Sequence, residues 1–555
     1  MRKIAIVILI VSSVLFSQTF QVGRQGVVVS ASKTASDIGI ELMQNDGNAV
    51  DAAIAVGFAL AVVYPPAGNI GGGGFMVIRS PDGIVTTIDF REKAPRAAHR
   101  DMYLDENGNP IDNLSIEGAL ASGVPGSVAG YAYAHAKFAS KPWQELLEPS
   151  VHLARTGFPV GYFIHTGLTH NQVRMSQYES SRKMFFPNGR APEIGETIIF
   201  TDLANTLERI AQRGWQEFYR GKTAKEITSS IQTAGGIISE WDMRHYEVKE
   251  RKPIHFTYRG YDIFSMPPPS SGGVCLAQIM KVVEQFPLSE YGFHSSTSIQ
   301  IVTEAERRAY ANRAYYLGDP DFYNVPVDFL ISNSLAESIA QSINLKKATP
   351  SKTVNHAPYP ESEETTHFSV VDKKGWAVSV TTTLNGSYGS GFVAGETGIL
   401  MNNEMDDFSI KPGFPNMFGL IGAEANSIQP QKRMLSSMTP TIVTRNDSLM
   451  WILGTPGGGT IISSVAQVLM NLIDYDMSLV QAVDAPRFHH QWLPDVVSIE
   501  EYGFSPDLLS ILEEKGYCFK TCSAIGDMNA IEMDWEKSYF IGVPDKRRQS
   551  AASAW

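Results

Sequence analysis

Alternating β-branched and aromatic residues predict one hairpin in the second half of the chain. Residues 365–371 read TTHFSVV and residues 376–383 read WAVSVTTT. Both runs are rich in residues that favour strands, and the intervening residues 372–375 (DKKG) have the composition of a turn. The pattern predicts two antiparallel strands, with Thr365 at the start of the first.

Apolar residues spaced three and four positions apart predict several helices along the rest of the chain. Residues 140–350 are expected to be mostly helical with loops, whereas residues 365–555 are expected to begin as sheet and to include helices. The periodicity alone indicates a mixed α and β protein. The predicted amphipathic helices cover residues 32–43, 203–219, 223–233, 297–317, 461–473 and 506–514.

Two apolar or glycine-rich runs need separate interpretation. Residues 49–63 are apolar but contain Asp51 and end before Pro65, so they are predicted to form a buried core helix rather than a membrane span. The four glycines at 71–74 lead into a strand through residue 78, with 84–90 as its partner. They lack the Lys-Ser/Thr of a phosphate-binding loop, and therefore indicate close approach of two backbones rather than a nucleotide site.

The N-terminus and the overall charge limit the class of protein. Residues 1–18 contain Arg2 and Lys3, an apolar stretch and a polar exit, the layout of a signal peptide, with an uncleaved anchor as the alternative. The net charge of −12 argues against a nucleic-acid partner. Cys518 and Cys522 could pair, although their spacing does not establish a disulfide.

Thr365 is a candidate nucleophile only if the chain is cut in front of it. A threonine hydroxyl needs a base beside it, and a free α-amino group, with a pKa of about 7.7–8.0, can serve. The same nitrogen within a peptide bond cannot accept a proton. Cleavage between Glu364 and Thr365 would therefore create the base and the active nucleophile together. A Thr-Thr pair by itself is an ordinary strand start.

Five further motifs carry residue types suited to binding an amino acid and an oxyanion. An arginine pairs bidentately with a carboxylate, acidic side chains accept an ammonium group, and glycine amides can approach a developing oxyanion. Each motif alone also has an ordinary structural interpretation, such as a surface ion pair, a solvated loop or a turn. The motifs are DFREKAP at 89–95, LN at 384–385, NNEMDDF at 402–408, LSSMTP at 435–440 and GTPGG at 454–458.

Together with the threonine hairpin, these motifs resemble the gamma-glutamyltransferases of the N-terminal-nucleophile hydrolase superfamily. The resemblance extends over nearly the whole chain after the signal peptide. It implies an α+β fold, a four-layer αββα sandwich made by two chains from one precursor. The large subunit would comprise residues 19–364 and the small subunit residues 365–555, assembled as a heterodimer.

The resemblance also implies an activity and a role for each site residue. The expected enzyme cleaves gamma-glutamyl amides such as glutathione through a gamma-glutamyl-threonine ester and passes the acyl group to water, amino acids or peptides. It needs no metal or organic cofactor, and the similarity to bacterial members implies a periplasmic location. The implied roles are Thr365 as nucleophile, Thr383 as its orienting partner, Gly457 and Gly458 as oxyanion donors, Arg91, Ser436 and Ser437 for the α-carboxylate, and Asn385, Glu404 and Asp407 for the α-ammonium.

One departure and two rival functions remain at this point. Residues 411–419 resemble the lid loop of many bacterial members, but Phe418 stands where those carry tyrosine. A phenylalanine can shield the pocket but cannot donate a hydroxyl hydrogen bond to Asn385, which bears on the balance between hydrolysis and transpeptidation. The rivals are a cephalosporin-type acylase and an unprocessed periplasmic amino-acid-binding protein. Residues 395–396 and 484–492 are assigned to architecture. His367 would share the face of the strand with Thr365, but the freed amine would lie closer to the hydroxyl, so His367 is not expected to be the base.

Overall fold

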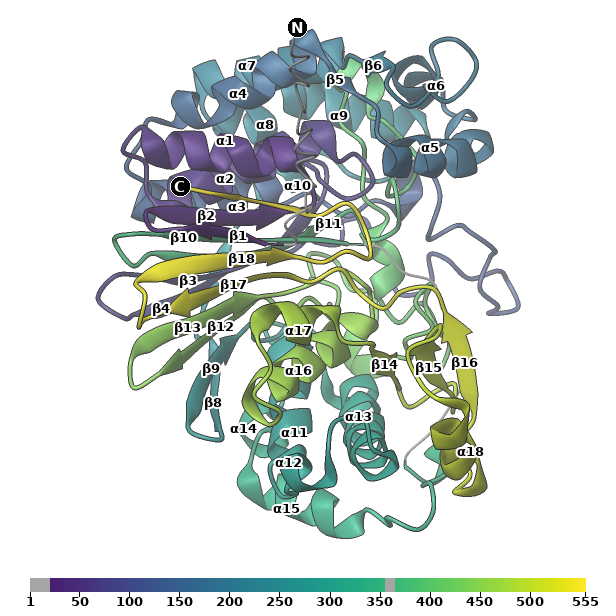
Figure 1. Cartoon of the computed structure of the whole chain (residues 1–555). Coiled ribbons are helices and arrows are strands. Elements are labelled where there is room, and N and C mark those ends of the chain that lie inside the picture. Colours follow the sequence, from purple (N-terminus) through teal and green to yellow (C-terminus); the bar gives the residue numbers. More distant parts are fainter. Residues whose placement is uncertain (1–19, 355–364) are drawn as a thin grey trace, which may run out of the picture.

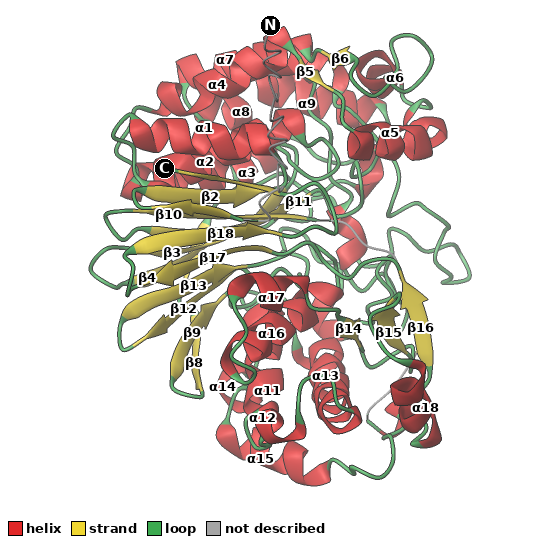
Figure 2. Ribbon diagram, viewed as in Figure 1, coloured by secondary structure: helices red, strands yellow, loops and turns green. Residues whose placement is uncertain are grey.

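Two seven-stranded sheets lie face to face, with helices covering the outer face of each (Figures 1 and 2). The computed structural model describes residues 20–354 and 365–555, so the predicted signal peptide and Glu364 lie outside the described residues. The first sheet runs in the order β19 (Ala551–Ala554), β2 (Gly26–Ser30), β10 (Thr366–Asp372), β11 (Ala377–Thr383), β3 (Gly73–Arg79), β4 (Val85–Phe90) and β7 (Lys249–Arg251). The second runs β1 (Gln21–Gly23), β18 (Tyr539–Pro544), β17 (Asn529–Asp534), β13 (Ser448–Leu453), β12 (Thr441–Arg445), β9 (Tyr261–Ser265) and β8 (Ile254–Tyr258).

The predicted threonine hairpin lies in the centre of the first sheet. β10 pairs with β11 in antiparallel register, Thr366 opposite Thr382 and Ser369 opposite Ser379. On its outer sides the hairpin pairs with β2 and β3, which come from the N-terminal part of the chain. The second sheet is likewise built from segments on both sides of residue 365. Neither part of the chain therefore completes a sheet alone.

Apolar side chains fill the space between the two sheets. Because side chains alternate across a strand, every second residue of β2 and its neighbours faces the opposite sheet. Buried residues that form this layer include Val27, Val29, Val77, Val371, Ile442, Ile452 and Ile531.

Helices form the two outer layers (Figure 1). The side of the first sheet carries α1 (Lys33–Gln44), α2 (Ala49–Val63), α3 (Ser127–Phe138), α4 (Trp143–Thr156), α5 (Tyr162–Met175), α6 (Glu179–Phe185), α7 (Thr201–Arg213), α8 (Gln216–Arg220), α9 (Lys222–Thr233) and α10 (Glu240–Arg244). The side of the second sheet carries α11 (Gly272–Val283), α12 (Leu288–Tyr291), α13 (Ser296–Tyr316), α14 (Val327–Leu330), α15 (Asn333–Ser342), α16 (Thr460–Ile473), α17 (Leu479–Asp484) and α18 (Pro506–Glu514). The four layers confirm the predicted αββα sandwich.

The apolar run at 49–63 is the core helix that its sequence predicts. Every residue of α2 is buried, and its first turn is closed by a capping box in which Asn48 and Asp51 bond each other's backbone amides. A helix that is apolar on all sides is stable only when surrounded by protein or lipid. Within residues 20–354 and 365–555, no helix has both the length and the apolar character needed to cross a bilayer.

Two secondary-structure predictions need correction in detail. Residues 140–350 are mostly helical, as predicted, but short strands that were not predicted, including β7, β8 and β9, also form there. In β8, buried and exposed residues alternate from Ile254 to Tyr258, a period that the helical neighbours obscured. The helix predicted at 203–219 is two helices, because Gly214 adopts a left-handed φ of 80° that ends α7.

The glycine run at 71–74 allows the close backbone approach that was predicted for it. A Cβ atom on Gly72 would lie 2.0 Å from the Thr383 carbonyl oxygen, and one on Gly74 would lie 2.3 Å from the Thr381 carbonyl oxygen. Both contacts are too short for any side chain. The glycines therefore let β3 lie tightly against β11, the strand that ends at Thr383.

We expect Gly72→Ala to destabilise the protein by about 1–3 kcal/mol or more, the range for overpacking, because a rigid carbonyl blocks the new methyl group. The measurement is the urea midpoint of unfolding. Gly161→Ala is the matched control, since its Cβ would meet only the Gln549 side chain at 3.4 Å. Equal midpoints for the two variants would contradict the close-approach explanation.

Candidate active site

A pocket lies where β10 begins and β11 ends. It brings together every site residue predicted from the sequence except Gly457, which is adjacent to the pocket residue Gly458, and Glu364, which lies outside the described residues. The pocket is lined by Arg91, Arg313, Thr365, Thr383, Asn385, Glu404, Asp407, Phe418, Leu420, Ser436, Ser437, Met438, Gly458 and Ile461.

Thr365 and Thr383 face each other at the same end of the hairpin. Their hydroxyl oxygens are 3.5 Å apart, as the antiparallel pairing of β10 with β11 requires. The backbone amide of Asn385 donates to the Thr383 hydroxyl oxygen at 2.7 Å, which leaves the hydroxyl hydrogen of Thr383 available to Thr365. Thr365 itself is only 4% exposed, so the reacting hydroxyl would be largely shielded from bulk water.

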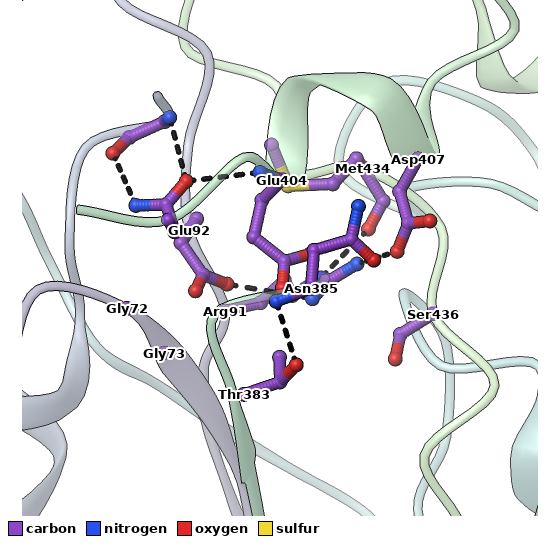
Figure 3. A network of polar contacts seen from close by, with 12 residues as sticks. Gly72, Gly73, Arg91, Glu92, Thr383, Asn385, Glu404, Asp407, Met434 and Ser436 are labelled. Atoms are coloured by element: carbon purple, nitrogen blue, oxygen red, sulfur yellow. Dashed lines mark hydrogen bonds and ion pairs between the residues drawn. The ribbon is translucent and has the colours of Figure 1, made fainter. Parts of the chain in front are cut away.

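Arg91 lies at the centre of a buried acidic cluster (Figure 3). One terminal nitrogen pairs with Glu404 at 2.5 Å and with Glu92 at 3.4 Å, and the other pairs with Asp407. The Nε and Nη2 atoms also donate to the backbone carbonyls of residues 434 and 435, both at 3.3 Å. This set of contacts holds the guanidinium rigidly at the pocket wall.

Burial and mutual repulsion perturb the acids of this cluster. Burial raises the pKa of Glu92 to about 7 and that of Glu404 well above its usual range, against the opposing effect of Arg91. Burial also raises the pKa of Asp407. For Arg91, burial disfavours the charge, but its carboxylate partners outweigh burial and raise its pKa. The arginine therefore stays charged. Its three acidic neighbours are harder to ionise, because they are buried close to one another.

The serine pair and the glycine loop lie on the other walls of the pocket. Ser436 lies beside the loop that joins β9 to α11, and its backbone amide donates to the Pro269 carbonyl at 2.9 Å. Ser437 is the next residue. The glycine loop joins the end of β13 to the start of α16, with φ angles of 135° at Gly457 and 50° at Gly458. The Gly457 carbonyl accepts from the Thr460 amide at 2.9 Å, which turns that carbonyl toward the helix.

The lid loop covers the pocket and is tied to its acidic turn, the 3-10 helix Glu404–Asp407. Asn416 donates to Asp407 at 2.9 Å and the Met417 amide donates to Asp406 at 2.7 Å. Phe418 is 4% exposed, and its carbonyl accepts from Gln491 at 3.3 Å. The lid is thus held by backbone and amide contacts in place of the absent tyrosine hydroxyl.

Sequence reasoning missed several pocket residues, of which Arg313 is the most polar. It lies on α13 and continues the buried stripe that includes Ala309 and Tyr310. The same helix buries four other charged residues, so no signal in the sequence singles out Arg313; they are Glu304, Glu306, Arg307 and Arg308. Leu420, Met438 and Ile461 are apolar and carried no such signal.

The fold and the pocket define the class of protein. A sandwich of two stacked sheets with a threonine at the start of a central strand is the architecture of the N-terminal-nucleophile hydrolases. The family model described as gamma-glutamyltranspeptidase matches residues 35–555. The chain belongs to that family.

Individual relatives agree with this assignment. The glutathione hydrolase proenzyme of Escherichia coli (strain K12) is 48% identical over 512 residues, which cover 92% of this chain and 88% of the relative. The crystal structure of gamma-glutamyltranspeptidase from Helicobacter pylori has a TM-score of 0.58 and 44% identity, and the match covers 58% of this chain and 93% of that chain. The crystal structure of cephalosporin acylase from Bacillus halodurans has a TM-score of 0.86 and 25% identity over 97% of both chains.

His367 lies near the nucleophile but is enclosed in the sheet. Its ring contacts the hydroxyls of Thr381 at 2.9 Å and Ser369 at 3.1 Å, and the side chain is fully buried. Burial lowers its pKa to about 3. A histidine that stays neutral at neutral pH and has both nitrogens occupied is suited to packing, which agrees with the expectation that it is not the catalytic base.

This lowered pKa predicts an effect of His367 on stability but not on the pH profile of catalysis. The unfolded chain binds the proton near pH 6.5 and the folded chain only near pH 3, so the contribution is present above pH 6.5 and lost as the pH falls. At pH 5 we expect a loss of about 2 kcal/mol relative to pH 8. His367→Gln should reduce the fall in melting temperature between pH 8 and pH 5, whereas exposed His99→Gln should not. A shift of the kcat pH profile in His367→Gln would contradict the packing role.

Proposed function

We propose that this protein is an autoprocessing gamma-glutamyltransferase that cleaves gamma-glutamyl amides such as glutathione and passes the acyl group to water, amino acids or peptides. The observation that carries the proposal is the position of Thr365, which lies at the start of β10 in a pocket that also holds Arg91 and a pair of serines. The Escherichia coli relative is named a glutathione hydrolase proenzyme, which supports both the substrate and the processing step.

Cleavage of the Glu364–Thr365 bond would supply the catalytic base. The freed α-amine of Thr365, with a pKa of about 7.7–8.0, takes the proton from its own hydroxyl as the oxygen attacks the γ-carbonyl. The Thr383 hydroxyl, 3.5 Å from that of Thr365, orients the pair. The protonated amine then gives its proton to the departing amine of the substrate, which leaves a gamma-glutamyl ester on Thr365.

The glycine loop would stabilise the tetrahedral oxyanion. The amides of Gly457 and Gly458 are placed by a turn that opens directly into α16, whose N-terminal end carries a partial positive charge. One such donor contributes about 2.7–4 kcal/mol to the transition state. A Cβ on Gly458 would lie 2.7 Å from the Phe418 ring, so glycine is also required for the lid to lie over the loop.

The remaining polar residues would recognise the glutamyl head. Arg91, Ser436 and Ser437 present donors suited to the α-carboxylate, and Asn385, Glu404 and Asp407 present acceptors suited to the α-ammonium group. The paired charges of the substrate match the mixture of cationic and anionic groups around the pocket. This match favours a zwitterionic amino-acid head.

A cephalosporin-type acylase is the second candidate, because the Bacillus halodurans acylase has a similar fold over 97% of this chain. The two activities differ in the acyl group that the pocket accepts. Comparison of gamma-glutamyl and glutaryl p-nitroanilides separates them, since the glutaryl compound lacks the α-ammonium group. Preference for the glutaryl compound would favour the acylase.

We also propose that the protein is exported from the cytoplasm. Residues 1–18 would act as the signal peptide and direct the enzyme to the periplasm, where extracellular gamma-glutamyl compounds are accessible. Thr365 would then begin a small subunit of residues 365–555, and the large subunit would begin near residue 19.

Thr365→Ala should yield an uncut chain whose kcat for gamma-glutamyl p-nitroanilide is lower by at least about 10³-fold, as expected for loss of a nucleophile. Intact-mass spectrometry and N-terminal sequencing should find wild-type fragments, the smaller starting at Thr365. Thr365→Ser keeps a hydroxyl and should still cut itself and react. A fully active Thr365→Ala protein, or an uncut but active wild type, would refute the mechanism.

The two fragments should remain associated after the cut, because β10 and β11 pair with β2 and β3 across the cleavage point. We expect the cleaved wild type to elute as one particle from a native size-exclusion column, at the volume of uncut Thr365→Ala. The fragments should separate only in denaturant. Their separation under native conditions would contradict the shared-sheet arrangement.

A further inference from the structure

Arg313 is a buried cation at the wall of the candidate active site. It lies on α13, is 5% exposed and lines the same pocket as Thr365. None of the roles considered above uses it. Its position invites the question of which anion it faces.

The guanidinium of Arg313 contacts the Ser437 hydroxyl directly and the Ser436 backbone through Ser271. Its Nη2 atom donates to the Ser437 hydroxyl at 3.0 Å, and its Nε atom donates to the Ser271 hydroxyl at 2.9 Å. Ser271 in turn donates through both its hydroxyl and its amide to the Ser436 carbonyl, each at 2.7 Å. The planar fork thus fixes one serine directly and the other through Ser271.

The contact with Arg313 also orients the hydroxyl hydrogen of Ser437. A serine oxygen that accepts from a guanidinium directs its own hydrogen elsewhere. Among the described residues, no acceptor takes that hydrogen. Because Ser437 lines the pocket, the hydrogen is available to an anionic ligand there.

The charge of Arg313 is not balanced by a carboxylate in contact with it. In residues 20–354 and 365–555 it forms no ion pair, whereas the comparably buried Arg307, Arg433 and Arg487 each pair with an aspartate. The neighbouring Cys275 is a neutral thiol, because burial raises its pKa to about 12. Asp407, which already pairs with Arg91, acts on the charge of Arg313 only from beyond ion-pair distance. A buried guanidinium without a carboxylate in contact is costly, and an incoming carboxylate would relieve that cost.

Arg91 cannot supply this attraction for a carboxylate alone, since three acids already compensate its positive charge. Its guanidinium contacts Glu92, Glu404 and Asp407 before any substrate enters. A substrate carboxylate approaching only Arg91 would also approach three acids. A second cation on the serine side of the pocket, with no carboxylate in contact among the described residues, changes that balance.

We propose that Arg313 is a positioning residue for the α-carboxylate of the gamma-glutamyl substrate: it orients the Ser437 hydroxyl, holds the Ser436 backbone through Ser271 and supplies positive charge on the side of the pocket that the carboxylate meets. The inference rests on the proposed function and adds a residue to it. It acts mainly through the serines, so its removal should weaken recognition of one substrate group rather than the chemistry at Thr365.

The test compares three p-nitroanilides that differ only in the head group. The gamma-glutamyl compound has both charged groups, the 4-aminobutyryl compound lacks the α-carboxylate, and the glutaryl compound lacks the α-ammonium. Arg313→Gln should lower the kcat/KM ratio of gamma-glutamyl to 4-aminobutyryl substrate by roughly 10- to 100-fold, the range expected for a hydrogen bond to a charged group. The loss should lie mainly in KM, and the glutaryl substrate should lose activity in parallel.

Two further variants separate recognition from structure. Arg313→Lys keeps the charge but cannot reach the Ser271 and Ser437 hydroxyls together. It should therefore lower the ratio of gamma-glutamyl to 4-aminobutyryl kcat/KM by less than Arg313→Gln does. Arg308→Gln, on the same helix, removes an arginine that pairs with Glu304 at 2.6 Å, and should lower stability without changing the ratio. All rates are expressed per molecule with a Thr365 N-terminus, so that incomplete self-cleavage does not affect them.

The outcomes distinguish this inference from the proposed function. Equal losses on all three substrates, or an unchanged ratio in either Arg313 variant, would overturn the positioning role while leaving the gamma-glutamyltransferase intact. A cleaved wild type that hydrolyses no gamma-glutamyl substrate would remove the proposed function and this inference with it. A selective loss of the two carboxylate-bearing substrates would support the inference.

Discussion

The antiparallel pairing of β10 and β11 between β2 and β3 is the constraint on which the rest of the structure depends. It places Thr365 directly before the first residue of a central strand, where neighbours on both sides fix the backbone. It also places Thr383 opposite Thr365, because β11 ends where β10 begins. A nucleophile held in this way would need little reorganisation before it reacts. The glycines of β3 permit the tight pairing that this arrangement requires.

Buried charge gives the pocket its chemical character. Arg91 keeps its charge because its acidic neighbours compensate for burial, and the same neighbours have raised pKa values because they lie close together without water. Arg313 lacks such carboxylate contacts and is held by serines instead. The pocket therefore has one arginine in contact with three acids and one without a carboxylate in contact, which suits a ligand that carries an anionic and a cationic group side by side.

Much of the site could be predicted from the sequence, because its residues occur in short motifs whose chemistry is local. The hairpin strands, the core helix α2 and the helix α18 were predicted nearly to the residue. The strands and α18 have a clear period, and α2 is a continuous apolar run with clear end signals. The strands β7 to β9 were missed because they are short and lie between helices. Arg313 was missed because nothing near it in the sequence marks a pocket, and its significance depends on serines more than 100 residues away along the chain.

The sequence by itself determined the threonine hairpin, the apolar core helix, the glycine run and the motif residues, because each follows from side-chain types at neighbouring positions. Only the tertiary structure decided that these motifs share one pocket, that parts of the chain on both sides of residue 365 build each sheet, and that Arg91 and Arg313 differ in charge compensation. These properties depend on contacts between residues far apart in the chain, and on the burial that those contacts create. Local patterns carry no information about either.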